Sequence, residues 1–151
     1  KNLSVSAQAR LVVENDDKAS MYSVKDLYDG IFSEVKVPIT FDFHHHRFQP
    51  GDLSEQEAFE LAMTTWQYHN VKPLFHYSSC RRTFEDPGCK AQAHADFIYE
   101  QINDYGHAVD IEVEAKAKEV AVLKYKDDTD SLLESYLPFD VHIDNQLVLE
   151  V

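Results

Sequence analysis

One stretch, from Pro38 to Pro50, sets strong limits on how this chain folds, because a run of β-forming residues ends there in Asp42 and three consecutive histidines. Strand alternation puts Asp42 on the face opposite Phe41 and Phe43. A carboxylate in an aromatic strand is costly to bury unless a cation or an arginine satisfies it. An Asp-x-x-His pair at a strand end favours a divalent-metal site, although parity leaves open which histidine takes part. The alternatives are a surface histidine cluster or an affinity tag, and a tag fits poorly because tags lie at chain ends.

Length, cysteine content and charge narrow the class of protein. The chain has 151 residues, enough for one domain with a real core, and no apolar run approaches the roughly 20 residues of a membrane span. Its two cysteines, Cys80 and Cys89, match no common zinc-knuckle spacing and suit a reducing cytoplasm. The net charge of −13 argues against general affinity for nucleic acid unless bound cations or a local patch reverse the sign.

Strand and helix signals alternate along most of the chain. Capping-box patterns at 23–26 and 54–57 begin two amphipathic helices. The predicted strands cover about 10–14, 38–43, 72–78 and 107–114, and the predicted helices about 23–35, 54–68, 91–104 and from about 115 onward. We therefore expect a domain over 1–127 and a tail over 128–151, acidic and apolar by turns, which has no assignment.

Four strand-helix units in succession predict an α/β fold with a parallel sheet and right-handed crossovers. Each predicted strand ends in a side chain that can bind metal, namely Glu14, Asp42, His76 and Glu114. Active sites of (β/α) barrels collect at such strand ends, whereas a doubly wound sheet binds its ligand beside a glycine-rich turn, and this chain has only four glycines. Because a complete barrel needs about 250 residues, the four β-α units predict half of a TIM (β/α)8 barrel, its second half.

Each further candidate has a plain structural interpretation beside the functional one. Alone, His76 is more often a satisfied core histidine, and His94 a residue at a helix start. Glu112 shares a strand face with Asp110 and Glu114, and three acids on one buried face need cations. The rim residues that either terminate elements in solvent or bind phosphate are Arg47, Ser78, Ser79, Arg81 and Arg82. Jointly, carboxylates and imidazoles at four successive strand ends indicate a multi-metal site.

Five ordered motifs resemble those of the UV damage endonucleases, between about residues 10 and 125: Leu11-Val-Val-Glu-Asn-Asp-Asp17, Asp42-Phe-His-His-His46, His76-Tyr-Ser-Ser79, His94-Ala-Asp-Phe-Ile98 and Glu114-Ala-Lys-Ala-Lys118. The resemblance implies a (β/α) barrel related to endonuclease IV, with a cluster of divalent metals. Manganese is the expected metal, with zinc or magnesium as alternatives. The implied location is the cytoplasm, at the nucleoid, or the nucleus in a eukaryote.

Carried over position by position, the resemblance assigns roles to individual residues. Its metal ligands are Glu14, Asp42, His45, His76, His94 and Glu114, of which Glu14, His76 and Glu114 are also catalytic. His44 and His46 would then lie behind the ligands or face the DNA. The implied reaction is attack of metal-activated water on the phosphodiester 5′ to a UV photolesion in double-stranded DNA, with the damaged bases turned out of the helix.

The chain departs from the family pattern in two ways. The upstream strands that supply further ligands and probe the lesion have no counterpart, and the chain begins with Lys1, so we expect a C-terminal piece whose upstream half is missing. Where many members have a metal-site lysine, this chain has Leu74. We hypothesise that Glu112 supplies the anionic oxygen lost with that lysine. The alternative is that Glu112 pairs with Lys72 or an upstream cation.

Two other functions remain open at this point. Xylose-isomerase-like sugar isomerases and epimerases also place Glu, Asp and His at strand ends, although the Asp-x-x-His and His-Tyr-Ser-Ser motifs count against them. A truncated half-barrel that binds metal or a partner without turnover is the second alternative. The leading interpretation is a metal-dependent DNA repair endonuclease whose partner is damaged double-stranded DNA, without membrane association.

Overall fold

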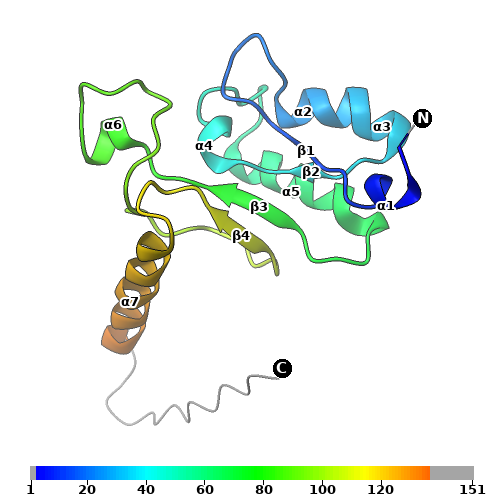
Figure 1. The fold of residues 1–151 in the computed structure, drawn as a ribbon. Coiled ribbons are helices and arrows are strands. Elements are labelled where there is room, and N and C mark those ends of the chain that lie inside the picture. Colours follow the sequence, from blue (N-terminus) through cyan, green and yellow to red (C-terminus); the bar gives the residue numbers. More distant parts are fainter. Residues whose placement is uncertain (1–2, 137–151) are drawn as a thin grey trace.

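A computed structural model describes residues 3–136 as short parallel strands alternating with helices (Figure 1). In chain order the elements are α1 Val5–Gln8, β1 Val13–Glu14, α2 Val24–Leu27, the π-helical turn η1 Tyr28–Phe32, α3 Ser33–Val35, β2 Ile39–Thr40, α4 Phe43–His46, α5 Glu55–Thr65, the 3₁₀ turn η2 Trp66–Tyr68, β3 Leu74–Tyr77, α6 Arg81–Phe84, β4 Asp110–Val113 and α7 Glu119–Tyr136. No helix within this part of the chain has the length and apolarity that a membrane crossing needs.

The strands form two parallel pairs that meet at one point. β1 pairs with β2 through Val13 and Ile39, and β3 pairs with β4 from Leu74–Asp110 onward. A single parallel bridge between Asp42 and His76 joins the pairs. The strand order is therefore β1-β2-β3-β4, with every neighbour parallel. This is a mixed α/β arrangement with two short parallel sheets, and the half-barrel interpretation remains a prediction.

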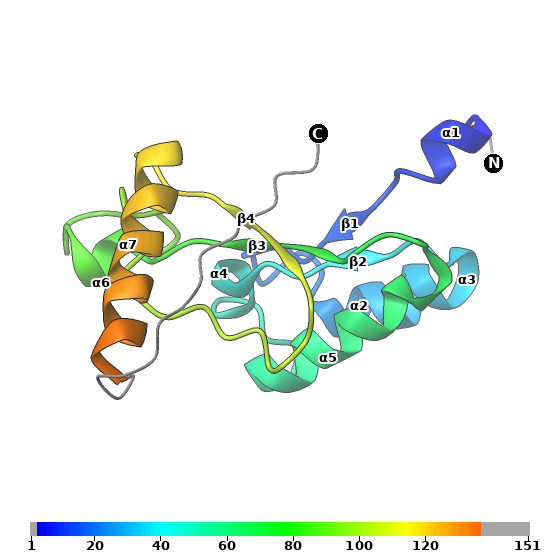
Figure 2. The ribbon, with the colours of Figure 1, turned by 90° about the horizontal axis from the view of Figure 1, so that it is seen from below.

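Two helical segments cover one face of the strands, as Figure 2 shows for α2, α3 and α5. Both begin at the expected capping boxes, where the Ser23 and Ser54 side chains accept from the amides of Asp26 and Glu57. The helices predicted over 23–35 and 54–68 are confirmed. The core between them and the strands is largely aromatic and consists of Val24, Leu27, Phe32, Ile39, Phe41, Phe43, Ala58, Phe59, Ala62, Trp66, Phe75, Tyr77 and Ile98.

The end of α5 is tied directly to strand β2. The Thr65 hydroxyl accepts a hydrogen bond from the Ile39 amide at 2.9 Å, and the indole of Trp66 donates to the Ile39 carbonyl at 2.8 Å. Both contacts are buried, so they satisfy backbone groups that β2 would otherwise leave unpaired inside the protein. They fix the strand at Ile39, three residues before Asp42, close to the candidate site.

The helix predicted over 91–104 is wrong. This stretch is irregular, because its backbone groups bond to neighbouring segments in place of one another. The Ala95 amide donates to the Ser79 carbonyl at 2.9 Å, and the Ala95 carbonyl accepts from the Lys116 amide at 3.0 Å. The Asp96 amide donates to the Glu85 carboxylate at 2.6 Å. Tertiary hydrogen bonds thus replace the helical ones, and only the short helix α6 lies between β3 and β4.

Three strand predictions also need correction. The strand expected over 10–14 is limited to β1 at Val13–Glu14, and Leu11 and Val12 are each 41% exposed. The strand expected over 38–43 ends at Thr40, because Asp42 caps the helix α4 that begins at Phe43. The strand expected over 107–114 is β4 at an open edge, and the side chains of Asp110 and Glu112 are 57% and 59% exposed. Its acids therefore do not lie on a buried face. Helix α7 runs through the expected boundary at 127/128, and the tail beyond residue 136 lies outside the described residues.

Candidate metal centre

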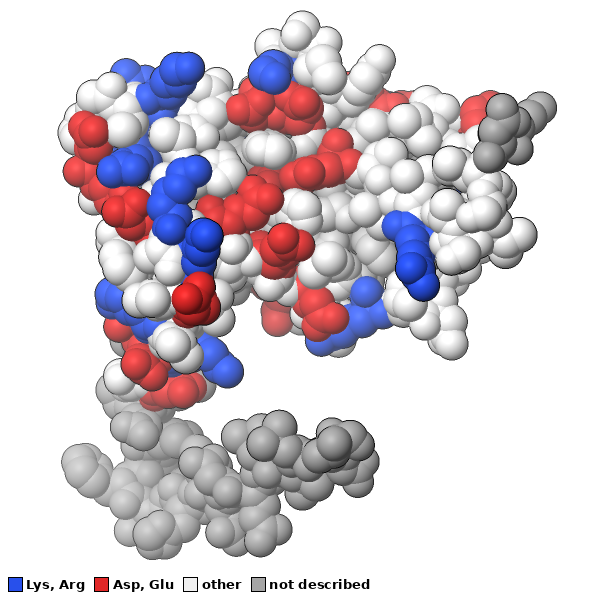
Figure 3. All heavy atoms as spheres, in the orientation of Figure 1, with Lys and Arg blue, Asp and Glu red and all other residues white. Residues whose placement is uncertain are grey.

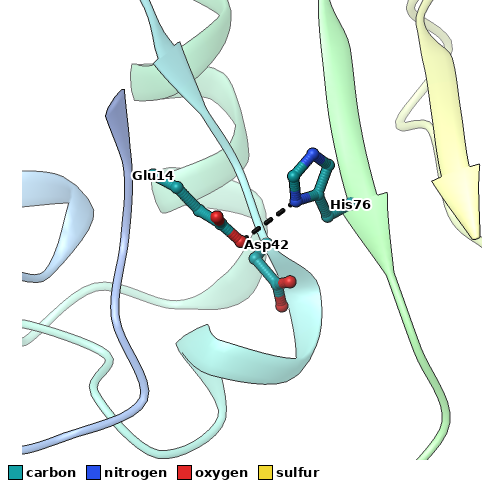
Figure 4. Close-up of side chains that lie close together, drawn as sticks. All are labelled: Glu14, Asp42 and His76. Carbon is teal, nitrogen blue, oxygen red and sulfur yellow. Dashed lines mark hydrogen bonds and ion pairs between the residues drawn. The ribbon is translucent and has the colours of Figure 1, made fainter. Parts of the chain in front are cut away.

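Three side chains from successive strand ends converge on the face of the strands opposite α2 and α5 (Figure 4). Glu14 comes from the end of β1, Asp42 follows β2, and His76 lies in β3. One ligand atom from each residue lies within 4.8 Å of the others. Glu14 Oε1 and His76 Nδ1 lie 3.0 Å apart. This is the convergence that parallel strand ends were expected to produce.

The position of Asp42 is fixed by hydrogen bonds to its backbone and to one of its oxygens. Its Oδ1 accepts from the His45 amide at 2.8 Å and so caps α4. The Asn15 side chain accepts from the Asp42 amide at 2.8 Å and donates to the Asp42 carbonyl at 3.0 Å. Asn15 is buried and was missed as a site residue by the sequence analysis. The available signal was a polar residue directly after the strand-end acid Glu14.

The second oxygen of Asp42, Oδ2, is buried without a hydrogen-bond partner among the described residues. Burial raises the pKa of Asp42 to about 7, against a stabilising bond from the His45 amide. Burial also acts to raise the pKa of Glu14, but its hydrogen bond to His76 and the nearby histidines leave that pKa lowered. Two carboxylates and an imidazole around an unsatisfied buried oxygen fit a divalent cation, which prefers this mixture of ligands.

The remaining expected ligands surround this group. His45 Nδ1 lies 3.4 Å from Glu14 Oε1 and 3.8 Å from Asp42 Oδ2. On the other side, Glu114 Oε1 lies 3.8 Å from His76 Nδ1, and Glu114 Oε2 lies 3.6 Å from His94 Nδ1. All six expected ligands are thus linked by contacts of 3.8 Å or less. Whether each one binds a cation remains a prediction.

Glu112 lies at the outer edge of the same group. Its Oε2 is 3.7 Å from His76 Nε2, so His76 has a carboxylate near each ring nitrogen. The suggested pairing of Glu112 with Lys72 does not occur, because the Lys72 ammonium contacts Asp110 at 2.6 Å. Leu74, which stands where many relatives were expected to carry a lysine, is 37% exposed.

The predicted DNA-contacting residues differ in exposure. Arg82 is exposed, and Arg81 lies 3.6 Å from the carboxylates of Glu85 and Asp96. Arg47 pairs with Glu100 at 3.0 Å. The two serines, Ser78 and Ser79, are buried, and the Ser79 hydroxyl accepts from the Tyr99 amide. Arg82 therefore remains the best placed for phosphate, because Arg81 and Arg47 lie against carboxylates. The buried serines do not support a direct contact.

The outer histidines of the triple-histidine run do not face solvent. His44 is 0% exposed and His46 is 4% exposed, so the alternative that they face DNA is wrong, and the alternative that they lie behind the ligands stays a prediction. The run forms the short helix α4, which turns its successive side chains in different directions. Only the middle histidine, His45, lies beside Glu14 and Asp42.

Acidic side chains cluster on the face that carries the site, as the red atoms across the middle of Figure 3 show. The whole chain has 27 acidic and 14 basic residues. A polyanionic substrate would be repelled by this face unless cations neutralised it. The acidic surface and the arrangement of the candidate ligands therefore both favour bound cations at this site.

The chain is therefore an α/β protein with a candidate centre for divalent cations. The carboxylates and imidazoles of this centre lie at the ends of parallel strands. Comparison with known proteins specifies the family: the chain belongs to the UV-endonuclease UvdE family, whose profile matches residues 1–140.

Two relatives and one solved structure illustrate this membership. The UV-damage endonuclease of Schizosaccharomyces pombe is 35% identical over 129 residues, covering 82% of this chain and 21% of that protein. The UV DNA damage endonuclease of Bacillus cereus strain Q1 is 30% identical over 133 residues, covering 83% and 39%. The crystal structure of SacUVDE matches with a TM-score of 0.63 and 32% identity, covering 82% of this chain and 40% of SacUVDE. The chain therefore spans less than half of each protein.

Neutralising Asp42 is expected to change how the stability of the cation-free protein depends on pH. Because its pKa rises from 3.8 to about 7 on folding, the folded state retains a proton that the unfolded state releases. This contribution therefore lowers stability as pH rises from about 4 to about 7. Asn keeps the helix cap without the charge.

The Asp42→Asn protein should gain stability relative to wild type as pH rises through that window, measured as urea midpoints in the presence of a chelator. A difference between the two proteins that stays constant from about pH 4 to about pH 7 would contradict the buried, unsatisfied state of Asp42.

Proposed function

We propose that this chain carries part of the active site of a metal-dependent DNA repair endonuclease that nicks the phosphodiester 5′ to UV photolesions. The observation that carries the proposal is the convergence of Glu14, Asp42 and His76 within 4.8 Å, from three successive strand ends. The names of the relatives favour this function over a sugar isomerase. We further propose that the chain is the C-terminal half of a (β/α)8 barrel, which its parallel strand order and partial coverage of its relatives support.

The proposed ligands have different roles in holding the metal. A bound divalent ion supplies Lewis-acid activation of water and compensation of the developing phosphate charge. Glu14 lies between His45 and His76 and would bridge their positions, while the free Oδ2 of Asp42 would anchor the buried end. Glu114 would join His76 to His94 on the β4 side. We propose manganese as the metal, with zinc or magnesium as alternatives.

The proposed substrate is damaged double-stranded DNA. Arg82 in α6 would contact its phosphates, with Arg81 and Arg47 contributing if their pairings with carboxylates open. The damaged bases would be turned out of the helix, because their stacking and pairing are already weakened. The proposed location follows the substrate, at the nucleoid in the cytoplasm or in a nucleus.

A plasmid-nicking assay tests the function. The complete protein that contains this chain should convert UV-irradiated supercoiled plasmid to nicked circles in the presence of Mn²⁺, and leave untreated plasmid largely intact. The 151-residue chain alone should nick negligibly, with activity restored when the upstream half is added. Equal nicking of both plasmids would argue against lesion recognition. Robust nicking by the chain alone would contradict the divided site.

Removing the charge of Glu112 tests its proposed part in the site. The complete protein with Glu112→Gln is expected to lose bound metal and about 10-fold in nicking rate, a loss typical for partners of metal ligands. Metal content is measured by elemental analysis after gel filtration. The matched control is Asp110→Asn, because Asp110 lies on the same strand face but contacts Lys72. Unchanged stoichiometry and activity in Glu112→Gln would reject the idea.

A further inference from the structure

His94 reaches the candidate centre from a segment without regular secondary structure. Its backbone forms an antiparallel bridge with Cys80, and its Nδ1 lies 3.1 Å from the Glu114 carbonyl oxygen. Its side chain is 21% exposed. The other ligands are fixed by strands or by a helix cap, whereas a side chain on an irregular segment depends on the packing of its ring. The residue that packs against His94 therefore affects where the ligand lies.

That residue is His44, in the short helix α4. Its side chain is completely buried, and its ring centroid lies 5.1 Å from that of His94, with the two planes at 83°. The ring of Phe48 packs nearly perpendicular to His44 as well, at 5.2 Å and 76°. Perpendicular aromatic pairs at this distance are favourable beyond the area that they bury. His44 therefore fills the space between Phe48 and the candidate ligand.

The polar atoms of His44 are not otherwise used. Neither ring nitrogen makes a hydrogen bond of ordinary geometry within residues 3–136, although the Gln92 backbone lies nearby. The ring of His44 therefore contributes to the site through its packing against His94.

We propose that His44 is a positioning residue, whose ring holds His94 in place to bind a divalent cation together with Glu114. The inference rests on the proposed metal centre and adds a residue that does not itself touch the ion. His44 acts on the far side of the site, through His94.

His46 provides a matched control on the same helix. It is 4% exposed, and burial lowers its pKa as it does that of His44. Its ring packs against Phe41 at 5.4 Å, in the hydrophobic core. Changing either histidine to leucine removes a buried ring at nearly the same depth. Only the change at His44 removes the contact with His94.

The experiment compares His44→Leu, His44→Phe and His46→Leu in the complete protein. Mn²⁺ affinity is measured by titration, with unfolding midpoints recorded in chelator. His44→Leu should lower the Mn²⁺ affinity of the site that contains His94 and Glu114 by about 10- to 100-fold, the range for residues behind metal ligands. His44→Phe, which keeps the perpendicular ring, should stay within about threefold of wild type. His46→Leu should lower the unfolding midpoint while leaving Mn²⁺ affinity unchanged.

Hydrogen exchange in metal-free protein separates this inference from the metal proposal. The amides of Ala95 and Asp96, which bond to Ser79 and Glu85, should exchange about tenfold faster in His44→Leu than in His46→Leu. Wild-type protein that binds no Mn²⁺ but shows this difference would reject the metal centre and leave the packing role. Equal exchange and equal Mn²⁺ affinity in the two leucine variants would overturn the inference, as would His44→Phe behaving like His44→Leu.

Discussion

Glu14→Gln is expected to slow nicking of UV-irradiated DNA by the complete protein at least about 100-fold, since even residues behind metal ligands contribute about 10- to 100-fold. Glu14 Oε1 lies 3.0 Å from His76 Nδ1 and 3.4 Å from His45 Nδ1, so one carboxylate faces ligands from two neighbouring strand ends. Glutamine keeps the size of the side chain but loses the charge that would bridge cations. Nicking is followed under single-turnover conditions, and metal content by elemental analysis.

Glu34→Gln is the control for this change, because Glu34 is an exposed acid in α3, on the helical side of the strands. It should match wild type in both measurements. Full metal content with full activity in Glu14→Gln would show that the charge of Glu14 is dispensable and would remove the main support for the proposed centre. Full metal content with lost activity would instead assign Glu14 a role in the reaction other than binding.

Phe59→Ala is expected to destabilise the protein by about 3–5 kcal/mol, the usual cost of deleting a buried aromatic side chain. Phe59 in α5 is 0% exposed, and its ring packs against those of Phe41, Phe75 and Tyr105 at 5.0 to 5.9 Å. A loss of this size is a large part of the roughly 5–15 kcal/mol that stabilises a typical domain. Chemical denaturation of the complete protein, monitored by fluorescence, measures the change.

Phe84→Ala provides the comparison, since Phe84 is 38% exposed and stacks only on Tyr99 at the surface. Its cost should stay below about 1.5 kcal/mol, the size of a surface aromatic pair. Equal destabilisation by the two changes would contradict the position of the core between α5 and the strands. Because Phe41 directly precedes Asp42, residual Phe59→Ala protein should also bind Mn²⁺ more weakly.

The helices on one face of the strands were predictable, because their signals are local. A serine followed three residues later by an acid satisfies exposed amides whatever surrounds it, so the starts at Ser23 and Ser54 were predicted correctly. The positions of Glu14, Asp42 and His76 at or near strand ends followed from runs of β-forming residues that stop there. That they converge depends only on the strands being parallel neighbours.

The features that sequence reasoning missed depend on distant contacts. Residues 91–104 have helical spacing, but bonds to Ser79, Glu85 and Lys116 compete successfully with the helix. Asn15 follows the strand predicted over 10–14, and its two hydrogen bonds to the Asp42 backbone have no local sequence signature. The burial of His44 follows from its place in α4, whose N-terminus is capped by Asp42. The resemblance to a family, and not strand parity, selected His45.

The single bridge between Asp42 and His76 has a mechanical consequence. β1 and β2 form one strand pair, and β3 and β4 form the other. The backbone joins the two pairs at this bridge. Glu14 and Asp42 belong to the first strand pair, and His76 and Glu114 belong to the second. A cation held among them would connect the two strand pairs through ligands from both. Separating the β1-β2 pair from the β3-β4 pair would then require breaking metal–ligand bonds. The resistance of the protein to mechanical unfolding would therefore depend on the ion as well as on the core.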